Sequence, residues 1–108
     1  MKKEMKYRKL VRDKIPDIIK NSGKEYRIHI SEEEEYVKEL KNKVIEEMEE
    51  FLENPTEEEM GDILEALEGF IDFYGLDKNL IEKVKLEKKN SRGGFKKRII
   101  LDKVIENE

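Results

Sequence analysis

Two amphipathic segments joined at Asn54-Pro55 constrain the fold of this chain more than any other feature. At about 100° per residue, apolar side chains form one broad stripe in the first segment and another in the second. The first stripe consists of Tyr36, Val37, Leu40, Val44, Met48 and Phe51. The second consists of Met60, Ile63, Leu64, Leu67, Phe70, Ile71 and Tyr74. Stripes of this period predict two helices that each bury one face.

Each of these helices also carries a pair of carboxylates at i and i+3, Glu47 with Glu50 and Glu59 with Asp62. Since 27 of the 108 residues are Asp or Glu, such pairs also arise on ordinary solvated faces. Glu47, however, falls inside the apolar stripe, where a carboxylate is costly unless it is paired or bound to a metal. Four carboxylates on two adjacent helices predict a site for a hard divalent cation, Mg²⁺ with Mn²⁺ as the alternative.

Glu59 has a competing role at the start of its helix. It stands at N3 of a capping box if Thr56 is the N-cap, but it is free for metal if Asn54 is the N-cap and Pro55 is N1. Glu59 and Asp62 are also in line with a seam of smaller or apolar residues, Ala66, Gly69 and Phe73. Another helix is expected to pack on this seam, and we predict that a second subunit buries it.

The remaining sequence predicts an all-α bundle of about four helices. The expected helices are Arg12 to Asn21, Ser31 (with Glu34 as a capping box) to about Glu53, about Pro55 to Tyr74 closed by Gly75, and Asp77 to about Asn90. Residues 26–30 and 95–101 have strand-like patterns, so a small two-stranded β ribbon beside the helices is a further option.

Composition bounds the class of protein. A chain of 108 residues is expected to form one domain, residues 1–108. It has no cysteine, which excludes disulfides and thiolate sites, and no apolar run approaches the roughly 20 residues of a membrane span, so a cytoplasmic protein is expected. Charged residues make up 46% of the chain, mostly Lys and Glu, a bias found in proteins of hyperthermophiles.

Charge is distributed unevenly along the chain. Residues 31–62 carry 14 acidic and 3 basic side chains, whereas residues 1–30 carry 10 basic and 4 acidic ones, and residues 81–108 carry 9 basic and 5 acidic ones. Mutual neutralisation in the fold accounts for part of this. The pattern also suits a nucleotide polyphosphate, with carboxylates for Mg²⁺ and terminal cations for phosphate oxygens. The net charge of −4 argues against nucleic acid as partner.

Three sequence motifs together resemble one family. E-E-x-x-E at residues 46–50, followed by E-x-x-D at 59–62, resembles the signature of the MazG-like all-α nucleoside triphosphate pyrophosphohydrolases, which include phosphoribosyl-ATP pyrophosphohydrolase. K-L-V-R-D-K-I-P at 9–16 and R-G-G-F-K-K-R-I at 92–99 resemble the two ends of a small single-domain branch. The resemblance implies a Mg²⁺-dependent hydrolase that releases pyrophosphate from a nucleotide and assembles as a homodimer or homotetramer.

By position in the motif, the resemblance implies Glu47, Glu50, Glu59 and Asp62 as metal ligands and Glu46 as an auxiliary carboxylate. Glu46 or Glu50 is the candidate base that takes a proton from the attacking water. Cationic side chains suited to phosphate are Arg12, Lys14, Lys89 and Arg92, and each has surface ion pairing as its alternative role. Asn90 either reads the base or ribose or caps its helix.

Two other functions compete with this prediction. One keeps the fold and makes phosphoribosyl-ATP the substrate, which the terminal motifs favour less. The other is a non-enzymatic helical interaction module whose acidic residues only keep it in solution.

Overall fold

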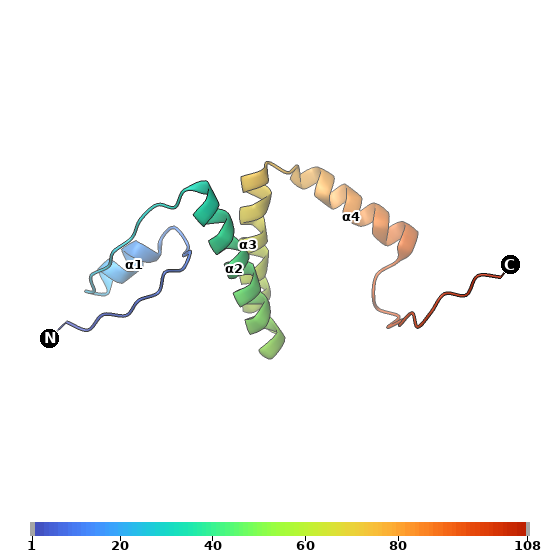
Figure 1. Cartoon of the computed structure of the whole chain (residues 1–108), viewed down its shortest axis with the longest axis horizontal. Helices are drawn as coiled ribbons and strands as arrows, with labels where there is room; N and C mark the ends of the chain where they lie inside the picture. Colours follow the sequence, from blue (N-terminus) through green and yellow to red (C-terminus); the bar gives the residue numbers. More distant parts are fainter. Residues whose placement is uncertain (1, 108) are drawn as a thin grey trace. The chain divides into compact units, whose positions relative to one another are not determined.

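The computed structural model describes residues 2–107 and contains four α-helices in that range, with no strand among the described residues (Figure 1). The helices are α1 (Ile15–Asn21), α2 (Glu33–Glu53), α3 (Glu57–Tyr74) and α4 (Lys78–Arg92). The predicted all-α class is confirmed. None of these helices is long and apolar enough to cross a membrane.

The chain divides into two compact units, which are described separately. The first comprises the residues up to Tyr74 and contains α1, α2 and α3, and the second begins at Gly75 and contains α4. The prediction of a single domain over residues 1–108 stays a prediction.

Helices α2 and α3 pack as an antiparallel hairpin (Figure 1), which supplies the main tertiary contact of the first unit. Among the described residues, Leu40, Ile63 and Ala66 are the apolar side chains that are more than nine-tenths buried. A Cβ at Gly69 would lie 3.1 Å from Cδ1 of Leu40, so the two helices approach closely at this point. The core therefore lies along the middle of the hairpin, and its small residues allow the short distance between the helices.

The face of α3 that meets α2 includes the seam of smaller residues, together with Ile63 from the predicted core stripe. The seam of Ala66, Gly69 and Phe73 does receive a helix, but that helix is α2 of the same chain, and the Phe73 ring lies 5.5 Å from the ring of Tyr36. Most of the predicted core stripe remains accessible instead, with Leu64 58% exposed. The prediction that a second subunit buries the seam is wrong, because small residues let α2 approach on that side.

Helix starts differ from the prediction by one to three residues. Thr56 caps α3, since its Oγ1 accepts a hydrogen bond from the backbone N–H of Glu59 at 3.2 Å. Asp77 caps α4 as predicted, accepting from the N–H groups of Asn79 and Leu80. The capping box predicted at Ser31 is wrong, because the N-cap of α2 is Glu32 and it makes no side-chain cap.

The optional β ribbon is also absent from the described residues. Residues 26–30 belong to the first unit and residues 95–101 to the second, and neither stretch is a strand. In the second stretch Arg98 has a φ of 58° and its N–H donates to the carbonyl of Phe95 at 3.2 Å. That turn interrupts the alternation of side chains on which the strand prediction rested.

Candidate functional site

Three carboxylates from two helices meet in the α2/α3 hairpin. One oxygen from each of Glu47, Glu50 and Glu59 lies within 4.8 Å of the other two. Glu47 and Glu50 share a side of α2 because they are three residues apart, and the short connection before α3 brings Glu59 beside them. Oxygens bound to one hard cation at roughly 2.0 to 2.6 Å are about 3 to 5 Å apart, with neighbouring ligands at the short end and opposite ligands at the long end. The donor set therefore suits a Mg²⁺ or Mn²⁺ ion, and the three oxygens are near enough for the side chains to close around one.

Glu47 is the buried member of this cluster. It is 7% exposed, and its Oε1 lies 3.4 Å from the ammonium of Lys43. Its Oε2 and the Oε2 of Glu59 are both buried without a hydrogen-bond partner in the part of the chain that the structure describes. Because a buried unsatisfied oxygen is unfavourable, these two atoms favour a hydrogen-bond donor or a cation as a further partner.

The pKa values of two of the clustered carboxyl groups, Glu47 and Glu59, also indicate that negative charge is unfavourable there. Burial raises the pKa of Glu47, the Glu50 charge raises it further, and Lys43 opposes both. Burial also raises the pKa of Glu59, followed by the charge of Glu50, a hydrogen bond with Glu50, and the charges of Asp62 and Glu47. Every group that shifts the pKa of Glu59 raises it, so like charges are held together there.

Thr56 and Glu59 form the N-cap hydrogen bond of the capping box that competed with the metal role. The N–H of Glu59 binds the Thr56 hydroxyl, but the Glu59 carboxyl is directed to Glu50. Backbone and side chain of Glu59 thus serve different partners.

Asp62 lies beside the cluster and is bound by a cation. Its Oδ1 accepts a 2.8 Å hydrogen bond from Nη2 of Arg12, which precedes α1. Its charge raises the pKa of both Glu47 and Glu59, so it is close to them although it is outside the group of three. Its role as a fourth ligand stays a prediction, whereas Arg12 is placed at the site.

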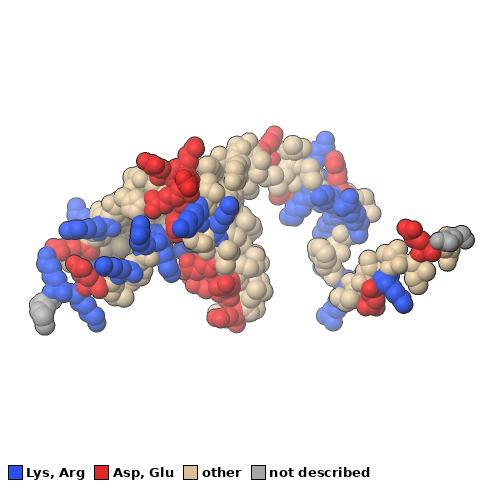
Figure 2. All heavy atoms as spheres, in the orientation of Figure 1, with Lys and Arg blue, Asp and Glu red and all other residues tan. Residues whose placement is uncertain are grey.

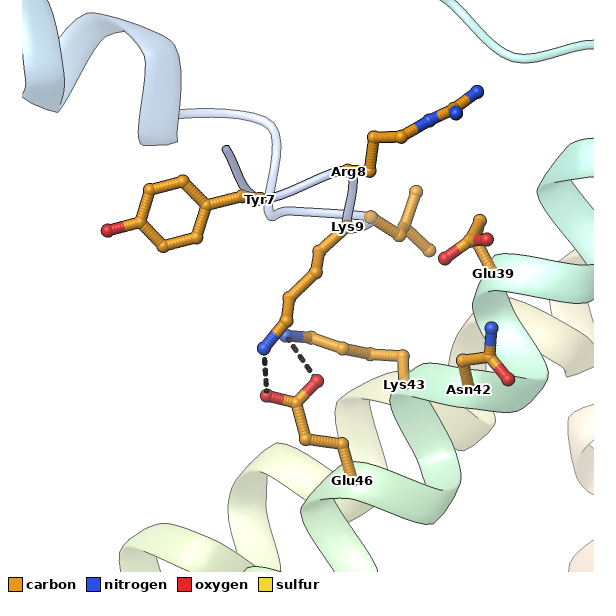
Figure 3. Close-up of a pocket in the computed structure, with 8 residues that line it drawn as sticks. Tyr7, Arg8, Lys9, Glu39, Asn42, Lys43 and Glu46 are labelled. Carbon is orange, nitrogen blue, oxygen red and sulfur yellow. Dashed lines mark hydrogen bonds and ion pairs between the residues drawn. The ribbon is translucent and has the colours of Figure 1, made fainter. Parts of the chain in front are cut away.

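Glu46 faces the N-terminal segment rather than the cluster (Figure 3). Its carboxylate accepts from Lys9 at 3.1 Å and lies 3.9 Å from Lys43. Neither Lys9 nor Lys43 was predicted from the sequence as a functional residue. The i,i+3 and i,i+4 spacing of Lys43 to Glu46 and Glu47 was a signal for the second of these, but Lys9 lies in a segment without periodicity.

The other predicted substrate residues lie at the start of α1 and on α4. Lys14 is exposed at the N-cap of α1. Lys89, Asn90 and Arg92 lie near the end of α4 in the second unit, and their part in the site stays a prediction. Figure 2 shows acidic side chains along the hairpin with basic side chains of the N-terminal part beside them.

Comparisons with protein-family models, with curated proteins and with solved structures found no match to this chain.

The raised pKa of Glu47 predicts how a substitution changes stability with pH. A group whose pKa is raised on folding contributes stability below its unfolded value of about 4.5 and loses that contribution as the pH rises through the folded pKa. In the absence of divalent cations, Glu47→Gln should therefore melt at a higher temperature than the unmodified protein at pH 7. The difference should vanish near pH 4, where Glu47 is also neutral.

Thermal unfolding by circular dichroism in a chelating buffer measures this difference. Glu49→Gln serves as control, because Glu49 is exposed on the same helix. Equal melting temperatures for Glu47→Gln and the unmodified protein at pH 7 would contradict the repulsion inferred for the cluster.

Proposed function

We propose that this chain is a MazG-like, Mg²⁺-dependent nucleotide pyrophosphohydrolase, which converts a nucleoside triphosphate and water to the monophosphate and pyrophosphate. The observation that carries the proposal is the meeting of Glu47, Glu50 and Glu59, with two buried oxygens that have no hydrogen-bond partner among residues 2–107. A carboxylate that only solubilised an interaction module would be exposed, whereas Glu47 is buried. House-cleaning of the nucleotide pool in the cytoplasm belongs to the same proposal.

The carboxylates have two proposed roles, metal binding and proton transfer. Glu47, Glu50 and Glu59 would hold Mg²⁺ or Mn²⁺, with Asp62 completing the set, and the bound cation supplies charge neutralisation and acidifies water. Glu50 is exposed beside the cluster and is the favoured base, with Glu46 as the alternative.

The reaction in this proposal is a single displacement at phosphorus. Water attacks the α-phosphorus, its proton passes to the carboxylate base, and the bond to the β-phosphate oxygen breaks to release pyrophosphate. Arg12 is positioned to exchange Asp62 for a phosphate oxygen, because a guanidinium binds either anion through the same N–H groups.

Product analysis tests this reaction. A panel of nucleoside triphosphates and phosphoribosyl-ATP is incubated with Mg²⁺, and we expect a monophosphate product together with pyrophosphate. Glu47→Gln should lower kcat/KM by about a hundredfold or more, because charge stabilisation by a metal is worth several kcal/mol. Glu49→Gln should retain activity.

Two results would contradict the proposal. One is release of orthophosphate and a diphosphate from every active substrate, which indicates attack at the γ-phosphorus. The other is unchanged turnover of Glu47→Gln at limiting Mg²⁺.

We further propose that the protein is a homodimer, with a homotetramer as the larger alternative, and that the accessible apolar face of the hairpin forms the contact. This face consists of Ile45, Met48 and Leu52 on α2 and Met60, Leu64 and Leu67 on α3. At 100° per residue, these residues flank the buried contact on the side opposite Glu50 and Asp62. In an antiparallel hairpin the two flanks face the same way, so one side is acidic and the other apolar. The small core of the first unit favours burial of this apolar side.

Sedimentation equilibrium of two variants separates this face from the buried seam. Leu64→Arg should dissociate the assembly and keep the helical content, because it places a charge in an apolar contact between chains. Gly69→Arg should instead lower the melting temperature, since its side chain would meet Leu40 within the hairpin. An unmodified protein that is monomeric at micromolar concentration would refute the assembly.

A further inference from the structure

An open cavity of about 290 Å³ lies between the N-terminal segment and α2 (Figure 3). Residues 7–10 form one wall, and the edge of α2 from Glu39 to Glu46 forms the other. Pockets for complete small-molecule ligands range from roughly 300 to 1,000 Å³. This cavity is therefore at the lower end of that range.

The ammonium groups of Lys9 and Lys43 converge on one carboxylate in this cavity. Lys9 Nζ lies 3.1 Å from Oε1 of Glu46, and Lys43 Nζ lies 3.9 Å from Oε2 of the same residue. Figure 3 shows both head groups on the same side of Glu46. Two like charges are thus held close to one anion, Glu46, which both of them contact.

The second partner of Lys43 links this cavity to the carboxylate cluster. Lys43 lies 3.4 Å from Oε1 of Glu47, the buried carboxylate of the candidate metal site. Use of Glu47 as a metal ligand leaves Lys43 with Glu46 as its remaining partner. Lys9 and Lys43 would then share Glu46 as their common ion-pair partner, directly beside the candidate metal site. Arg8 and Glu39 also line this cavity.

The backbone before Lys9 is held in an unusual conformation. Arg8 has a φ of 46°, in the left-handed region that residues other than glycine rarely adopt. Its side chain points away from the two ammonium groups, whereas the Lys9 side chain reaches α2 (Figure 3). Local strain of this kind is concentrated at functional sites.

From these contacts we propose that Lys9 and Lys43 form the subsite for the β- and γ-phosphates of the substrate, the part that leaves as pyrophosphate. This inference rests on the proposed hydrolysis and names the residues that bind the leaving group. Lysine is suited to this role because its three N–H donors bind phosphate as a point charge without a fixed orientation. Release of Glu46 when phosphate binds would also make that carboxylate available to water.

Binding of inorganic pyrophosphate to the Mg²⁺-saturated protein tests the subsite by calorimetry, independently of turnover. Lys9→Gln and Lys43→Gln should each weaken the affinity on the order of tenfold, the usual effect of losing a charged hydrogen bond. Lys41→Gln is the matched control. Lys41 is exposed on the same helix and points about 200° away from Lys43, so its substitution should leave the affinity unchanged.

The outcomes distinguish this inference from the function on which it rests. Affinity for pyrophosphate that is unchanged in both variants, or absent in the unmodified protein, overturns the subsite even if nucleotides are hydrolysed. Weakened binding in both variants supports the subsite even if no nucleotide in the panel is cleaved, in which case the hydrolysis proposal alone is refuted. As a control for the metal site, titration of Mg²⁺ alone should give similar affinities for Lys9→Gln and the unmodified protein, because Lys9 is not a proposed metal ligand.

Discussion

The close contact between Leu40 and Gly69 sets the distance between α2 and α3, and the arrangement of the carboxylates depends on it. Because the helices approach so closely, Glu47 is enclosed, and Glu59 lies opposite Glu50 instead of in solvent. The contact also determines which face of α3 remains accessible. One packing interaction thus links the acidic side of the hairpin, the apolar side and the two carboxylate oxygens that are buried without a partner in the described part of the chain.

Enclosing several carboxylates is unfavourable, and the first unit offsets only part of that cost. Arg12 binds Asp62, and Lys9 and Lys43 bind Glu46, so cations border the cluster on two sides. Within the described residues, each interaction that shifts the pKa of Glu59 raises it, so its charge is opposed there rather than compensated. A bound divalent cation would relieve this repulsion, which is why we propose the cluster as a metal site and the neighbouring cations as contacts for an anionic substrate.

Helical periodicity correctly predicted both hairpin helices and placed Glu47 on a buried face. Gly75 was correctly predicted after the last residue of α3, and Asp77 as the N-cap of α4. Periodicity did not show which of the two apolar faces of α3 meets α2, because both have the same period and only packing decides between them. Small residues at Ala66 and Gly69 were the signal, and they were assigned to a contact between chains.

The ion pairs of Lys9 and Arg12 could not be predicted from the sequence. The segment that carries them has no regular secondary structure, and its path over the hairpin depends on interactions between residues 37 and 50 positions apart. Local patterns carry no information about such pairings.

Calorimetric titration of Mg²⁺ into the unmodified protein and Glu47→Gln at pH 7 tests the central claim most directly. The account predicts saturable binding that persists at moderate ionic strength, because an enclosed site is screened less than a solvated face. Binding should be at least about tenfold weaker in the variant, since it loses a charged ligand. Equal, weak binding in both proteins that disappears on addition of salt would contradict it and leave the carboxylates as ordinary surface charge.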